Sequence, residues 1–96
     1  MVTITGLYPN KSGVIYDSPT LQIEFHGISM GGLAVEARVL NAEGQSIGVM
    51  AFDVKRADLV YTANPDPYEA LVEAIQANII AQMTADNPYN ATFATT

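Results

Sequence analysis

Two stretches of alternating apolar and polar residues, joined by a short polar segment, predict a long β-hairpin over residues 33–55. Successive side chains in each arm point to opposite faces, and β-branched residues dominate, as is typical of half-buried strands. The connecting segment Asn41-Ala42-Glu43-Gly44-Gln45 has Asn first and Gly fourth, which favours a type I turn followed by a left-handed glycine. This bulged turn pairs Asn41 with Gln45, and then Val39 with Ile47, Ala37 with Val49 and Val35 with Ala51.

A second register places only Glu43 and Gly44 in the turn. It would require a positive φ at Glu43, which costs ~1 kcal/mol or more for a residue with a Cβ, so the bulged turn is favoured. The second register pairs Val35 with Phe52, Ala37 with Met50 and Leu33 with Val54. Under the favoured register, one face of the hairpin is a mixed surface, more apolar than solvent requires, formed by Glu36, Arg38, Leu40, Met50 and Phe52.

Shorter alternating segments before the hairpin predict further strands at Val2–Thr5, Val14–Tyr16 and Leu21–His26. Turn-rich segments separate them, and the segment from Gly27 to Gly32 is expected to be a flexible connector. Because the links are short, antiparallel pairing is expected.

A helix is predicted over residues 67–84, after a segment at 57–64 that no pattern assigns. Asp66 is expected to cap it, with Pro67 at the first helical position and Glu69 completing a variant of the capping box. A bulky stripe is expected to cover the sheet and consists of Tyr68, Leu71, Val72, Ile75, Ile79 and Met83. A second stripe, the alanine stripe, is expected to lie roughly opposite and to face away from the sheet, and it consists of Ala70, Ala74, Ala77 and Ala81. It either admits a neighbouring backbone or is simply an exposed face of good helix formers.

These elements predict a single α+β domain over residues 1–85, in which the helix packs on a small antiparallel sheet of four or five strands. The remaining residues, 86–96, form a tail or arm that carries Tyr89 and Phe93 as its large side chains. A short strand, an arm that docks on a neighbour and a frayed end are all compatible with its composition.

Charge narrows the range of functions. Only 15% of the 96 residues are charged, and the net charge is −6. The segment 57–96 contains five acidic residues and no Lys or Arg, so direct binding to nucleic acid is not expected. The chain has no cysteine and no apolar run of 18 residues, and its first residues lack the pattern of a signal peptide. Neither a membrane-spanning helix nor secretion by a signal peptide is therefore expected.

Candidate catalytic groups are few. His26 is the only histidine, and a set of His26, Ser29 and Asp17 can be written down, but no motif fixes its geometry. Asp53 lies among apolar strand residues and is expected to form a salt bridge with Lys55 or Arg38, or to cap the strand end. We expect no catalytic site, no cofactor, no metal site and no small-molecule substrate.

A low charge content, a long hairpin with two semi-apolar faces and one two-sided helix are typical of proteins that bury part of their surface in a partner. In general character the whole chain resembles small virion proteins of tailed bacteriophages, such as tail-tube, connector or tail-completion subunits. That resemblance implies a non-enzymatic structural protein that is assembled in the host cytoplasm and binds copies of itself or other subunits. The alternative is a small acidic inhibitor or regulatory binding protein, for example a phage anti-defence protein. The candidate interface residues are Glu36, Arg38, Leu40, Met50, Phe52, Ala70, Ala74, Ala77, Ala81, Tyr89 and Phe93.

Overall fold

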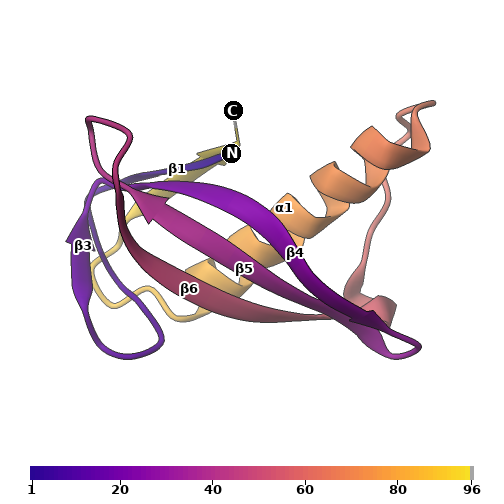
Figure 1. Ribbon diagram of the computed structural model, residues 1–96, viewed down its shortest axis with the longest axis horizontal. Coiled ribbons are helices and arrows are strands. Elements are labelled where there is room, and N and C mark those ends of the chain that lie inside the picture. The colour runs from indigo at the N-terminus through magenta and orange to yellow at the C-terminus, as the bar shows by residue number, and fades with distance from the viewer. Residues whose placement is uncertain (96) are drawn as a thin grey trace.

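The computed structural model describes residues 1–95, which form a two-layer α+β fold as predicted (Figure 1). The main sheet is antiparallel, with strand order β6–β5–β4–β1–β7. Its strands are β1 (Val2–Thr5), β4 (Thr20–Ser29), β5 (Gly32–Leu40), β6 (Ser46–Lys55) and β7 (Thr92–Thr95). A two-stranded sheet consists of β2 (Leu7–Pro9) and β3 (Ile15–Asp17), and the helical elements are η1 (Arg56–Asp58) and α1 (Pro67–Ala85).

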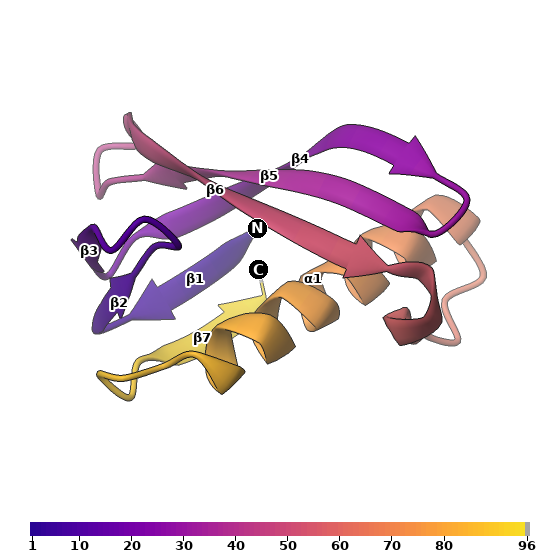
Figure 2. The same ribbon diagram turned by 90° about the horizontal axis from the view of Figure 1, so that it is seen from below.

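The second layer is made of α1 and the β2–β3 sheet, which cover the same face of the main sheet (Figure 2). We call this the inner face. The ammonium group of Lys11, in the β2–β3 loop, lies 4.8 Å from the ring centre of Phe52 on the inner face. The buried core between the layers includes Val2, Ile4, Leu21, Val35, Val39, Met50, Phe52, Val54, Ile75, Ile79 and Met83.

The turn between β5 and β6 is the predicted bulged turn. The Asn41 amide donates to the Gln45 carbonyl (2.9 Å), the Gly44 amide donates to the Asn41 carbonyl (3.0 Å), and Gly44 has φ +78°. The side-chain oxygen of Asn41 also accepts from the amides of Glu43 and Gln45. The polar side chain at the first turn position thus fixes the turn locally.

The favoured pairing beyond this turn is wrong, because a β-bulge at Ile47 shifts the register by one residue. The observed pairs are those of the second register: Val35 with Phe52, Ala37 with Met50 and Leu33 with Val54. Leu40 pairs with Ser46, but the next pair joins Val39 to Gly48 and leaves Ile47 without a partner on β5. A one-residue shift exchanges the two faces of a strand. Met50 and Phe52 are therefore 2% and 3% exposed in the core, not on the outer face as expected.

A close fit between two distant residues accompanies this shift. Gly48 faces inward opposite Val39, and a Cβ at Gly48 would overlap the hydroxyl of Tyr16 on β3. Tyr16 therefore occupies the space that a side chain on β6 would otherwise fill. The register of the hairpin depends in part on this contact with the second layer.

Helix α1 begins at the predicted cap: a side-chain oxygen of Asp66 accepts from the amides of Tyr68 (2.9 Å) and Glu69 (3.3 Å). The reciprocal half of the capping box is absent, because the Glu69 carboxylate accepts from the Asn64 side chain (3.0 Å) and the Asp66 amide donates to Asn64 (3.0 Å). The side chain of Asn64, and not that of Glu69, therefore accepts the hydrogen bond from the Asp66 amide.

The helix is rotated relative to the expected orientation. Ala70 and Ala74 are buried against the sheet, although the alanine stripe was expected to face away, and Tyr68 is 70% exposed. Small side chains at these two positions let α1 approach the sheet closely, while Ala77 and Ala81 are exposed as expected.

Two segments without a firm assignment are strands. The expected connector from Gly27 to Gly32 continues β4 and β5, with Ser29 paired to Gly32 around a two-residue turn. In the C-terminal segment, β7 pairs with β1 along its whole length. Phe93 of β7 packs edge-on against Tyr8, with ring centres 5.4 Å apart. Burial, and then the nearby carboxylate of Asp86, raise the pKa of Tyr8 to about 12.

Candidate protein-binding surface

The predicted interface residues that remain exposed do not form one surface. Glu36, Arg38 and part of Leu40 belong to the hairpin, whereas Ala77 and Ala81 lie on the exposed side of α1. Tyr89 is half exposed in the loop after α1, and Phe93 is partly buried. Because the fold has two layers, the outer face of the sheet and the exposed side of the helix point in opposite directions. Burial removes Met50, Phe52, Ala70 and Ala74 from any surface.

The outer face of the sheet carries charges in a diagonal arrangement. Glu24 and Glu36 are directly opposite each other on β4 and β5. Each carboxylate is paired diagonally: Glu24 with Arg38 (3.3 Å) and Glu36 with the His26 ring (3.5 Å). An exposed ion pair such as that of Glu24 with Arg38 contributes about 0–1 kcal/mol. It offsets part of the repulsion between the two glutamates, and these side chains give this face a polar character.

The catalytic set considered from the sequence is not assembled. His26 lies beside Glu36, the Ser29 hydroxyl donates to the Gly32 carbonyl (3.4 Å), and Asp17 accepts from Ser18 (3.1 Å). Asp53 takes part in neither of the two ion pairs found among residues 1–95, and its backbone carbonyl accepts from the Gln82 side chain (2.9 Å). Within the described part of the chain, no cluster of three or more His, Cys, Asp or Glu side chains could hold a metal ion.

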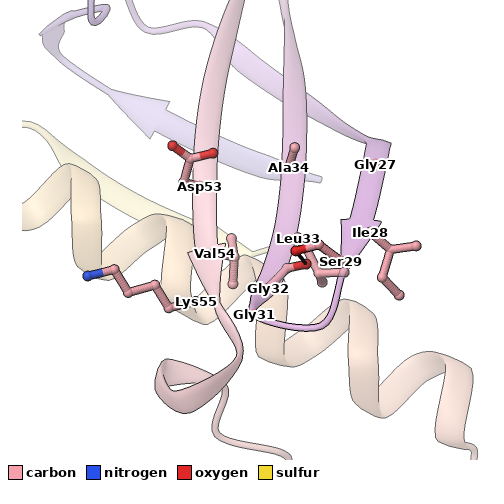
Figure 3. Close-up of a pocket in the computed structure, with 10 residues that line it drawn as sticks. All are labelled: Gly27, Ile28, Ser29, Gly31, Gly32, Leu33, Ala34, Asp53, Val54 and Lys55. Atoms are coloured by element: carbon pink, nitrogen blue, oxygen red, sulfur yellow. Dashed lines mark hydrogen bonds between the residues drawn. The ribbon is translucent and has the colours of Figure 1, made fainter.

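A hollow of about 400 Å³ lies at the end of β4, β5 and β6 (Figure 3). Its walls are mostly backbone and small side chains, with Asp53 and Lys55 as the ionisable residues. In the close-up, Lys55 extends away from Ile28 and Ser29. The hollow therefore presents few converging polar groups, which a small-molecule site requires.

An uncovered apolar region lies where the β4–β5 tip faces the first half of α1. Phe25, Ile28 and Met30 are 51%, 84% and 87% exposed. Two adjoining grooves of about 280 Å³ and 320 Å³ connect these residues to Leu71 on α1. We call this region the open-end patch and define it as Phe25, Ile28, Met30, Leu59, Tyr61 and Leu71.

The same region contains an unpaired strand edge. β4 has ten residues, but β1 pairs only with its first two, through Val2 with Leu21 and Thr3 with Thr20. On the side of β1, the described structure therefore leaves residues 22–29 of β4 without a neighbouring strand. Figure 1 shows the first half of α1 continuing past this edge. An exposed edge beside apolar side chains is a template for pairing with another chain.

A third groove, of about 240 Å³, runs between this edge and the helix. β4 contributes Gln22, Ile23 and Phe25, and α1 contributes Tyr68, Val72, Ile75 and Gln76, with Met1 at one end. The space directly beside β4 is therefore backed by helix, just as β1 is backed by helix further along the sheet.

Sequence reasoning missed the open-end patch, although a signal for it existed. Ile28 and Met30 are large apolar residues inside a glycine-rich segment expected to be a loop. Apolar side chains in a short, exposed connection have nothing to pack against within the domain, so they indicate a contact surface. The unpaired edge had no comparable signal, because it depends on how far β1 extends along β4.

Comparisons of this chain with protein-family models, with curated proteins and with solved structures found no match. Among the described residues, no helix has the length and apolar character needed to span a membrane.

Proposed function

We propose that the protein is a non-enzymatic building block that acts by binding other proteins, either copies of itself or other subunits of a larger assembly. The observation that supports this proposal is the open-end patch, where large apolar side chains are exposed beside an unpaired strand edge. Burying such side chains is favourable by roughly 25 cal/mol per Å². A partner that covers the patch would gain this free energy.

The low charge content of the chain agrees with this role, because a subunit that is buried in an assembly needs fewer charges for solubility. In its general character the chain is similar to small virion proteins of tailed bacteriophages. The specific proposal is therefore a phage virion subunit, assembled in the host cytoplasm. The alternative, a small acidic inhibitor, would act as a discrete monomer or dimer.

The proposal is tested by measuring mass in solution by sedimentation velocity over a wide range of protein concentration. We expect the mass to rise with concentration, and Ile28→Lys to suppress the rise because it places a charge in the open-end patch. Val14→Lys is the matched control: Val14 is also exposed, but it precedes β3 at the other end of the molecule. A monomeric mass at every concentration would contradict assembly from copies of itself and favour the inhibitor.

A further inference from the structure

We propose that the open edge of β4 binds a single extended arm of a partner protein, which adds as a strand in line with β1 and rests on the first half of α1. This inference rests on the proposed function and names how the partner is recognised. The predicted arm has apolar residues at alternate positions and a basic residue between them.

The direction of the backbone groups follows from the pairing of β1 with β4. The Ile4 amide donates to the Pro19 carbonyl (3.0 Å), and Val2 lies opposite Leu21. In an antiparallel ladder, every second residue turns its peptide groups to the same neighbour. By this alternation Ile23 and Phe25, the next residues in the series, turn theirs to the vacant side of β4. They offer donors and acceptors in the geometry that a strand requires.

The side chains of an added strand would contact an apolar groove on the inner face of the sheet. Residues opposite Ile23 and Phe25 share their face of the sheet, which is the inner face, because Ile23 pairs with Ala37 and Phe25 with Val35. On that face the groove is lined by Tyr68 and Val72 of α1. Apolar residues at two alternate positions of the arm would fill this groove, as Val2 and Ile4 of β1 fill the core further along.

The charges near Glu24 determine which residue is favoured at the arm position between the two apolar ones. The arm residue opposite Glu24 would point to the outer face, beside the Glu24 carboxylate. That part of the outer face carries two carboxylates, Glu24 and Glu36, and one permanent cation, Arg38, which pairs with Glu24. A basic residue at this position of the arm is therefore complementary to the excess negative charge.

The occupant is a bare arm and not the same edge of a second copy. Two copies that paired β4 with β4 around a two-fold axis would each bring an α1 helix beneath the shared edge. The groove lining places α1 directly beside Ile23 and Phe25, so the two helices would compete for one space. An extended arm brings no second layer and avoids this conflict.

The other sheet edges are less suited to accept a strand. On β6, the bulge at Ile47 interrupts one end, and the Gln82 side chain occupies the Asp53 carbonyl near the other. Bulges and covering side chains are the usual protection of edges. β7 has only four residues. The register of β4 also shifts, between Phe25 and Gly27, so the regular part of its open edge runs over residues 22–25. That regular part is the stretch that adjoins the apolar groove.

In the test the arm is fused to the same chain, so that it can pair with the β4 edge even if a separate peptide would bind only weakly. Thr-Val-Lys-Val is added before Met1, preceded by a start Met. By the register of Val2 with Leu21, the last added Val falls opposite Ile23 and the first opposite Phe25. The matched control is Thr-Pro-Lys-Pro, which keeps length and charge but lacks the two amide donors.

We expect the Val arm to slow amide hydrogen exchange at Ile23 and Phe25 by about tenfold or more and to raise the melting temperature. The Pro arm should leave both at wild-type values, and Phe25→Asp should cancel the effect of the Val arm. Equal exchange rates at these amides with the two arms would overturn the proposed site.

The role of the site in assembly is read from the same variants by sedimentation. If the wild-type chain assembles, the Val arm should block assembly and the Pro arm should not. Assembly of equal strength with the Val arm would overturn docking at this edge but leave the building-block role intact. A wild-type chain that never assembles would contradict assembly from copies of itself. The exchange rates at Ile23 and Phe25 would still decide whether the open edge of β4 accepts a strand.

Discussion

The two ends of the molecule differ in how completely the second layer covers the sheet. At one end, β1, β7, the β2–β3 sheet and the second half of α1 enclose the core, and Ile79 and Met83 are fully buried. At the other end, β4 and β5 project beyond β1, and Phe25, Ile28 and Met30 are exposed (Figure 2). We call the first end the closed end and the second, which carries the open-end patch, the open end.

This difference separates residues that stabilise the fold from residues available for binding. A side chain at the closed end contributes free energy of folding by leaving water within the monomer. A side chain of the same type at the open end still contacts water and can contribute to association instead. Substitutions at the two ends can therefore test this separation.

The same substitution at the two ends gives the sharpest test. Ile79→Ala removes a buried side chain and should lower the free energy of unfolding by about 2–5 kcal/mol. Ile28→Ala, at a residue that is 84% exposed, should change it by no more than about 0.5 kcal/mol. Denaturant unfolding monitored by circular dichroism measures both values. Similar losses for the two variants would refute the distinction between the ends.

The fit of Tyr16 against Gly48 contributes to the closed end. Gly48→Ala should cost about 1–3 kcal/mol because the new methyl group overlaps the Tyr16 hydroxyl. In a Tyr16→Phe background the hydroxyl is absent, so the same substitution should cost less. A double-mutant cycle on the unfolding free energies isolates this coupling. Equal costs in both backgrounds would show that the overlap is not the cause.

The cap at Asp66 fixes the start of α1 at the open end. Asp66→Ala should cost about 0.5–2 kcal/mol, because it removes the acceptor of the Tyr68 and Glu69 amides. Asp66→Asn keeps an acceptor and should remain close to wild type. Faster amide exchange confined to the first turn of α1 would locate the effect. An equal loss in both variants would indicate that charge matters, and not the hydrogen bonds.

Tyr8 gives the closed end a dependence on alkaline pH. Its pKa is raised to about 12 by burial and by Asp86, above the value near 10 of an unfolded chain. The unfolded state therefore loses this proton first, so stability is intact below about pH 10 and falls as pH rises toward 12. Tyr8→Phe should fall less steeply over this range in thermal melts. Identical pH profiles for the two proteins would contradict this assignment.

Features set by neighbouring residues could be predicted from the sequence. The Gly44 turn depends on Asn41 within the same loop, and the cap depends on Asp66 and the two amides that follow it. The α+β class followed from alternation and helical periodicity along the chain. In each case the deciding contacts lie within a few residues, where local propensities act directly.

Features set by distant residues could not be predicted. The register beyond the turn reflects the inward placement of Met50 and Phe52 and the contact of Tyr16 with Gly48, across 32 positions of the chain. Burial of the larger side chains outweighed the regular pairing that the turn alone would favour. The open edge of β4 likewise reflects where β1 begins and ends, which periodicity within β4 does not contain.

The bulge at Ile47 also affects which changes in length the hairpin can accept. If Ile47 were deleted, Leu40 opposite Ser46 would be followed directly by Val39 opposite Gly48, and every other pair would keep its place. We expect this deletion to retain the wild-type near-ultraviolet circular dichroism, whereas deletion of Val49 would have to turn Ile47 inward opposite Val39, into the space that Tyr16 occupies. The unpaired Ile47 thus marks a position where the hairpin can lose one residue and still keep the same side chains in the core.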